Sequence, residues 1–247
     1  RNESHLWVIY SDVNGYPYDV DGDMLVVYDY NKSKEITDRL NAQGYLAVLS
    51  LATPEQFANE VAHMYRNGYK NVRFVGGNET PFIVSREELY PYDKFMKEDY
   101  VTNPALSQAM IALFQETRKT SKVEEGAPEE AFTRMLKKRE EEFVTALKNA
   151  EFMVPCVKTE NGEEIEISFQ YLDVTEQIGS DNGEKVIAIP VFTDGFEMNK
   201  CYPGKTEDML CTFDELVATV VELGASGIII NALGISHYMS VKTLEAL

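Results

Sequence analysis

The stretch Val186–Phe192, with the sequence VIAIPVF, decides how the chain folds, because the chain contains an earlier counterpart. Met24–Tyr30 has the sequence MLVVYDY, and a glycine stands shortly before each stretch, at positions 22 and 183. Short apolar runs that follow a turn residue are typical of buried strands. The two stretches therefore predict two related strands and mark the start of an internal repeat.

The repeat comprises residues 22–89 and 183–244, which follow one order of signals. After each strand come a capping box, an amphipathic helix that ends near a glycine, and a second apolar strand. In a capping box a threonine accepts a hydrogen bond from a backbone amide, and a Gln or Glu three residues later reaches back. The boxes are Thr53–Gln56 and Thr212–Glu215, and the second strands are VRFV at 72–75 and GIIIN at 227–231.

This alternation of strands and capped helices predicts an α+β fold, with mixed α/β modules. We expect two tandem modules, each a mixed sheet with packed helices, joined by a helical segment. The expected boundaries are 1–100 for a diverged first module, 101–126 for a linking helix and loop, and 127–247 for the second module. Pro104 and Pro128 stand at the first positions of two expected helices, 104–119 and 128–150, where proline is favoured.

The composition indicates a globular protein that does not bind polyanions. The 247 residues are 44% hydrophobic, and 23 basic against 41 acidic residues give a net charge of −18. This charge repels nucleic acid and anionic lipid, and no apolar run approaches the roughly 20 residues of a membrane helix. We expect no nucleic acid or membrane partner, which leaves a protein or a small molecule; the sequence does not indicate the oligomeric state.

The cysteines indicate a reducing compartment. Cys156, Cys201 and Cys211 are too few and too unevenly spaced for a disulfide framework or a thiolate metal site. We therefore expect a cytoplasmic protein. The chain begins at Arg1 rather than at methionine, which fits removal of a leader or of an upstream segment.

The sequence DVDGD at residues 19–23 has the carboxylates of a calcium loop but not its spacing. Its glycine comes one place too early, and Tyr30 stands where such a loop has its bidentate glutamate. The repeat has Ser-Asp-Asn-Gly-Glu, residues 180–184, at the same place. Because Asp-Gly and Asn-Gly favour tight turns, we expect a hairpin turn here and no metal.

A catalytic nucleophile would combine Cys201 or Cys211 with His237 and an acid such as Asp194. In the repeat, however, His237 aligns with Phe82, so this position accepts an aromatic ring. The chain also lacks phosphate-loop, dinucleotide-binding and metalloprotease motifs. We therefore expect no catalytic residues and no cofactor. An enzyme with an unrecognised carboxylate or cysteine-histidine site remains the alternative.

Three segments carry a family likeness: LKNAEFMVPCV at 147–157, IAIPVFTDGFEM at 187–198 and GIIINALG at 227–234. They resemble the SseB-like family, named for an enhanced serine-sensitivity protein, most clearly over residues 140–247. The first copy looks like a diverged member. The resemblance implies a compact α/β module of undetermined biochemical role, with no established catalytic residues.

A candidate binding site lies where two strands of the second copy end. If the strands ending at Phe192 and Asn231 are parallel neighbours, the loops that follow them emerge at one edge of the sheet. Thr193, Asp194, Gly195 and Asn231 would then offer a hydroxyl, a carboxylate, backbone amides and a side-chain amide to a ligand. Alternatively, these residues only cap the next turn and end a strand. The sequence thus favours a non-catalytic binding or interaction module.

Overall fold

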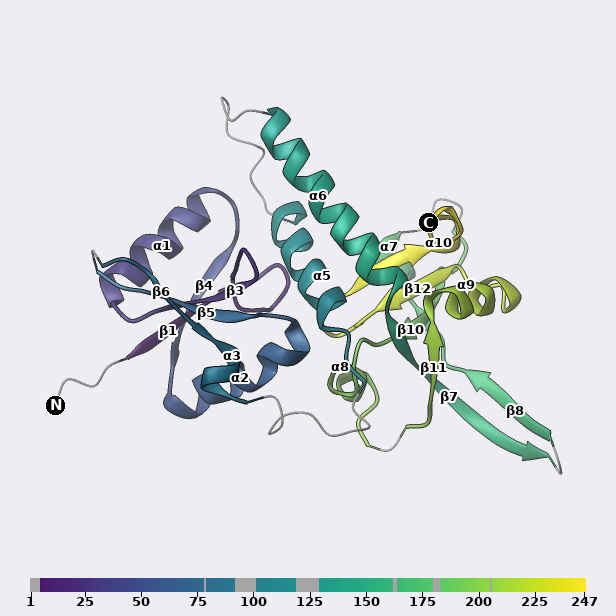
Figure 1. Ribbon diagram of the computed structural model, residues 1–247. Coiled ribbons are helices and arrows are strands. Elements are labelled where there is room, and N and C mark those ends of the chain that lie inside the picture. The colour runs from purple at the N-terminus through teal and green to yellow at the C-terminus, as the bar shows by residue number, and fades with distance from the viewer. Residues whose placement is uncertain are drawn as a thin grey trace. The chain divides into compact units, whose positions relative to one another are not determined.

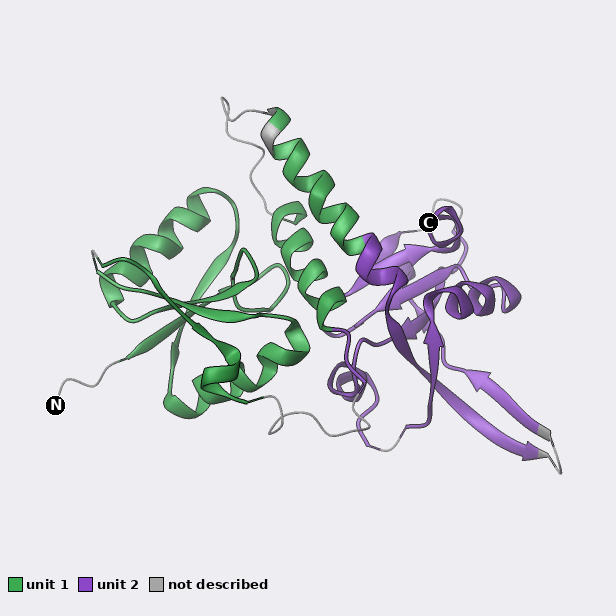
Figure 2. Ribbon diagram, in the orientation of Figure 1, with its two compact units in different colours: residues 1–98, 104–143 green, residues 99–103, 144–247 purple. Residues whose placement is uncertain are grey.

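The computed structural model describes residues 5–77, 79–91, 101–118, 129–161, 164–179, 183–204 and 206–247. The chain forms two compact units (Figure 2): unit 1 consists of residues 1–98 and 104–143, and unit 2 of residues 99–103 and 144–247. Each unit combines helices with a mixed sheet, which confirms the predicted α+β fold. The expected helix start at Pro128, the linking loop at 120–126 and the turn at Ser180–Asn182 lie outside the described residues.

Unit 1 is built on a sheet with the strand order β4-β1-β3-β5-β6, in which β2 also pairs with β3 (Figure 1). β3 and β5 are parallel and the other pairs are antiparallel. The strands are β1 (Leu6–Ser11), β2 (Asp19–Val20), β3 (Asp23–Val27), β4 (Ala47–Ala52), β5 (Asn71–Val75) and β6 (Phe82–Ser85). The helices are α1 (Tyr30–Ala42), α2 (Pro54–Asn67), α3 (Arg86–Leu89) and α5 (Pro104–Thr117), and α6 (Glu129–Lys148) begins in unit 1 and ends in unit 2.

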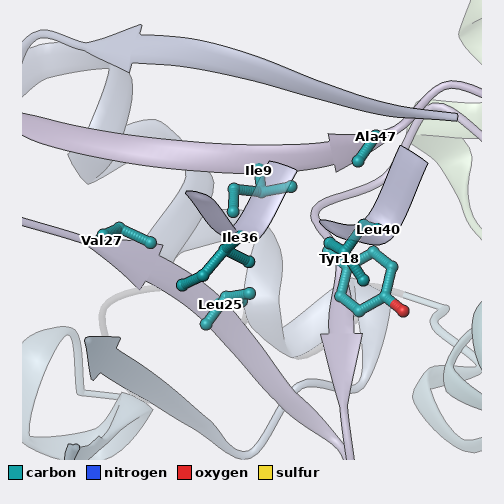
Figure 3. Close-up of a cluster of buried hydrophobic side chains, with 7 residues drawn as sticks. All are labelled: Ile9, Tyr18, Leu25, Val27, Ile36, Leu40 and Ala47. Carbon is teal, nitrogen blue, oxygen red and sulfur yellow. The ribbon is translucent and has the colours of Figure 1, made fainter. Parts of the chain in front are cut away.

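Helices cover both faces of this sheet, so every residue of the central strand β3 is buried. On one face α1 contributes Ile36 and Leu40 to a cluster with side chains of β1 to β4 (Figure 3). On the other face Tyr10 of β1 donates a hydrogen bond to Glu60 of α2 at 2.8 Å. A strand covered on both faces reads as a continuous apolar run, which is why MLVV lacks alternation.

Helix α5, expected as part of a linker, packs against α2 within unit 1. Gly68 ends α2 in the left-handed conformation (φ 81°), and a Cβ at this position would overlap the carbonyl oxygen of Pro104. Close approach of the two helices therefore requires glycine here. The module boundaries expected from the repeat stay a prediction, because compact units in the structure do not show which segments arose by duplication.

The sequence DVDGD forms a hairpin turn, as predicted. Val20 pairs with Asp23, and the two residues between them, Asp21 and Gly22, have φ values of 56° and 88°. Positive φ at both central residues is the geometry of a two-residue hairpin turn with matching strand twist.

Unit 2 contains the strand order β13-β12-β10-β9 and a second set, β11-β7-β8. An antiparallel bridge between Met153 of β7 and Phe192, directly after β10, joins the two sets. The strands are β7 (Glu151–Asn161), β8 (Glu164–Phe169), β9 (Leu172–Asp173), β10 (Ile187–Val191), β11 (Asp208–Thr212), β12 (Gly227–Ile230) and β13 (His237–Ser240). The helices are α7 (Thr175–Ile178), α8 (Gly195–Cys201), α9 (Phe213–Glu222) and α10 (Val241–Ala246).

The two units share one strand connectivity. Replacing β1, β3, β4, β5 and β6 by β7, β10, β11, β12 and β13 converts the strand order of unit 1 into that of unit 2. The registers also correspond: Trp7–Val27 with Met153–Phe192, and Phe74–Phe82 with Ile230–His237. Both predicted capping boxes are confirmed, at Thr53 and Thr212.

Candidate functional site

The structure brings together the residues predicted to surround a binding site in unit 2. β10 and β12 are parallel neighbours, as predicted, so the residues that follow them meet at one edge. The backbone amide of Thr193 donates to Oδ1 of Asn231 at 3.0 Å, and Nδ2 of Asn231 donates to Oγ1 of Thr193 at 2.9 Å. Asp194 follows as the N-cap of α8, and Gly195 is the first residue of that helix.

These polar side chains lie inside the protein rather than on its surface. Thr193 and Asp194 are 0% exposed and Asn231 is 1% exposed. Oδ1 of Asp194 accepts hydrogen bonds from the amides of Phe196 and Glu197, each at 3.0 Å. Asn231 has a φ of 49°, a conformation that asparagine adopts more readily than most residues. Each side chain therefore shapes the edge of the sheet, and direct contact of these groups with a ligand stays a prediction.

Sequence reasoning missed Asn103, which belongs to the same network. Its Nδ2 donates to the carbonyl oxygens of Thr193 and Glu151 at 2.8 and 2.7 Å, and its Oδ1 accepts from the amide of Glu151 at 3.0 Å. The amide side chain thus substitutes for strand backbone between the start of β7 and the end of β10. No local signal marks this role, because the partners are 48 and 90 residues away along the chain.

Apolar side chains are exposed next to this buried network. Leu233, in the loop after β12, is 66% exposed, and Phe196, in the first turn of α8, is 40% exposed. The loop lies close to the end of α8, since the backbone of Leu233 acts on the pKa of the Cys201 thiol and lowers it, against the larger effect of burial. The carboxyl edge of β10 and β12 therefore presents the exposed apolar side chains of Leu233 and Phe196 beside a buried hydrogen-bond network.

Cys201 and Cys211, the two candidate nucleophiles, lie in surroundings that do not favour their thiolates. Burial raises the pKa of Cys211 to about 11, and burial also raises the pKa of Cys201. Both thiols therefore stay protonated at neutral pH, whereas a catalytic cysteine needs its thiolate. His237 lies on β13, opposite Ile230.

The aspartates of DVDGD are committed to contacts within unit 1. Oδ1 of Asp19 accepts from the amide of Gly22 at 2.9 Å and from Gln108 at 2.7 Å. Asp23 forms a 2.7 Å ion pair with Arg73. Among the described residues, no group of three or more His, Cys, Asp or Glu side chains is placed to hold a metal ion. In the same part of the chain, none of the helices has the length and apolar character needed to cross a membrane.

Residues 129–240 match the family model of the SseB protein N-terminal domain. The match begins with α6 and ends with β13, so it includes all the strands of unit 2. It supports the resemblance to the SseB-like family over this part of the chain. No curated protein and no solved structure matches the chain.

Proposed function

We propose that the protein is a non-catalytic binding protein built from two SseB-like modules, and that a protein or small-molecule partner meets the carboxyl edge of β10 and β12. Two tandem copies are supported by the shared connectivity, by the matching registers and by the equivalent capping boxes. Gene duplication accounts for this agreement more simply than convergence does, because register and order agree at several independent pairings.

The observation that carries the binding role is the exposed Leu233 on a fixed loop. The carbonyl oxygen of Asn231 accepts from the amides of Gly234 and Ser236, at 2.8 and 3.1 Å, so the loop closes tightly on itself. Leu233 projects from this loop with 66% of its surface exposed, next to the edge that also exposes Phe196. Apolar groups held on a rigid backbone lose little entropy when a partner covers them.

Unit 1 also exposes apolar side chains at the corresponding edge. Tyr30 follows the N-cap Asp29 of α1, as Gly195 follows the N-cap Asp194 of α8, and Tyr30 is 56% exposed. Phe82, at the register position of His237, is 49% exposed. The exposed positions differ between the units, because Tyr30 and Phe82 correspond to Gly195 and His237 rather than to Phe196 and Leu233. Both units nevertheless expose apolar side chains at this edge, which supports a contact function for it.

The test is capture of partners by the full chain, together with a thermal-shift screen of metabolites. Leu233→Asp combined with Phe196→Ser should abolish binding of whatever is captured. The matched control is Val221→Asp, since Val221 lies on α9 of the same unit and is 49% exposed. Equal loss of binding in the control would show that the edge is not the contact surface. Chemical turnover of a captured metabolite would show that the protein is an enzyme.

A further inference from the structure

A second surface of unit 2, the outer edge of β8, is separate from the carboxyl edge of β10 and β12. β7 pairs with β11 through residues 151–155 and with β8 through residues 156–161. The outer part of the β7–β8 hairpin is therefore two-stranded, and Figure 1 shows it extending from the rest of unit 2. β8 is the last strand of its set, and no described strand pairs with its other side.

Alternate backbone groups of β8 point away from β7. The amide of Gln170 donates to the carbonyl oxygen of Pro155. The backbone amides and carbonyls of Gln170, Ser168 and Glu166 therefore point toward β7, because these groups alternate along a strand. The amides and carbonyls of Ile165, Ile167 and Phe169 must then face outward. These three residues supply the hydrogen-bonding groups of an edge that can accept another strand.

The opposite edge of the hairpin is covered by Glu207. Its carbonyl oxygen accepts from the amide of Cys156 at 3.0 Å, and its carboxylate accepts from the amide of Lys158 at 2.9 Å. Phe169 and Ile167 are the register partners of these two residues on β8. The alternation on both strands thus agrees. Glu207 covers the β7 side of the hairpin at Cys156 and Lys158, whereas no described strand pairs with the β8 side.

The exposed side chains of β8 combine apolar and acidic groups. Ile165 and Ile167 are 64% and 40% exposed and lie on the face that continues from the buried Cys156. Glu166, between them, is exposed on the other face. The strand sequence EIEISF contains no basic residue.

We propose that the outer edge of β8 binds an extended segment of a partner protein, in which basic residues alternate with apolar ones, by addition of a strand. The outward backbone groups would supply the main-chain hydrogen bonds, and the side chains would select the sequence. Apolar residues of the partner would lie beside Ile165 and Ile167, and a lysine or arginine would lie beside Glu166.

The charge of the chain disfavours a second copy at this edge. Each copy has a net charge of −18, so pairing two β8 edges would bring acidic strands and acidic proteins together. The same carboxylates attract a basic strand. The acidic residues of the edge thus oppose self-association and select the partner.

The test uses the full chain and a fluorescent peptide, Lys-Val-Lys-Val-Lys-Val, with blocked ends, followed by fluorescence anisotropy. We expect saturable binding that Ile167→Pro weakens more than 10-fold. Because the amide of Ile167 faces outward, proline removes no hydrogen bond between β7 and β8, so the hairpin should persist. Far-UV circular dichroism checks this. Leu233→Asp should leave peptide binding unchanged, which separates this proposal from the proposed function.

Two N-methylated peptides separate strand addition from simple charge attraction. One carries methyl groups on the amides of all valines and the other on the amides of all lysines. Strand addition requires that only one of them loses binding, since alternate amides face β8. Equal binding of both peptides, or full binding by Ile167→Pro, would overturn the proposal. Sedimentation showing a dimer of the wild type and a monomer of Ile167→Pro would assign the edge to a second copy instead.

Discussion

Asn231 and Thr193 hold the ends of two parallel strands together through hydrogen bonds that run in opposite directions. The Thr193 amide donates to the Asn231 side chain at 3.0 Å, and the Asn231 side chain donates to the Thr193 hydroxyl at 2.9 Å. Both residues are almost fully buried. The pair extends the contact between β10 and β12 beyond the last paired residues, Val191 and Ile230.

Asn231→Ala should lower the free energy of unfolding by about 2–4 kcal/mol, because it leaves buried groups of Thr193 without a partner and places alanine at positive φ. Asn231→Gly removes the same hydrogen bonds, but glycine adopts positive φ without strain. The free energy of unfolding should therefore fall by about 1 kcal/mol less than in Asn231→Ala. Urea unfolding followed by far-UV circular dichroism measures both. Fluorescence is unsuitable here, because the single tryptophan, Trp7, lies in unit 1. Wild-type stability of Asn231→Ala would contradict a stabilising role for the pair.

Gly227→Ala should be strongly destabilising, by more than about 2 kcal/mol, because overpacking against backbone cannot be relieved by rotating a side chain. A Cβ at Gly227 would overlap the carbonyl oxygen of Met239 on the neighbouring strand β13. Gly195→Ala is the matched control in the same unit, since no atom lies within 4 Å of a Cβ added at Gly195. It should change the melting temperature little. Similar effects of both substitutions would refute the steric explanation.

Asp19 should make the protein more stable as the pH falls from 7 to 5. Burial raises the pKa of Asp19 to about 6, although the hydrogen bond from Gln108 and the charge of Arg139 act in the opposite direction. Because the folded-state pKa exceeds the unfolded value, protonation favours the folded state, and the gain appears as the pH falls through 6. Asp19→Asn should remove this dependence and stabilise the protein at pH 7 by on the order of 2 kcal/mol.

Denaturation at a series of pH values measures this effect. Asp173→Asn serves as the control, because hydrogen bonds from Thr175 and Lys185 lower the pKa of Asp173 to about 2. A group with a lowered pKa contributes stability that is lost only as the pH falls below about 4. Its replacement should leave the dependence between pH 5 and 7 intact. The prediction would be contradicted if the wild type lost stability as the pH fell from 7 to 5 and if Asp19→Asn left this pH dependence unchanged.

All the thiols should react slowly with a disulfide reagent at pH 7. Burial raises the pKa of Cys156, Cys201 and Cys211, which lowers the fraction of reactive thiolate. Cys201 is partly exposed and should react first, whereas Cys156 and Cys211 are buried and should react only after unfolding. Following the reagent by absorbance, with and without guanidinium, gives the rates. Rapid labelling of Cys201 that His237→Phe abolishes would revive the nucleophile hypothesis.

The sequence predicted features that depend on neighbouring residues. Thr53 and Thr212 form their capping boxes within four residues, and the Asp21-Gly22 turn needs only its own backbone preferences. The parallel pairing of β10 and β12 was also predictable, because a strand and a capped helix separate them.

Features that depend on distant partners were not predictable. The burial of Thr193, Asp194 and Asn231 could not be read from their polar character, because it depends on Asn103 and on strands far along the chain. Likewise, α5 reads as an amphipathic linker helix, and only its packing against α2 makes it part of unit 1.

The path of the chain has a consequence for synthesis on the ribosome. The strands of unit 1 are complete at Ser85, but the chain passes through residues 99–103 of unit 2 before it forms α5 at Pro104–Thr117. Until α5 leaves the exit tunnel, the nascent sheet lacks the helix that packs against α2 and that supplies Gln108 to the buried Asp19. Folding of unit 1 during synthesis therefore has to wait for α5, which follows residues 99–103 of unit 2 in the chain.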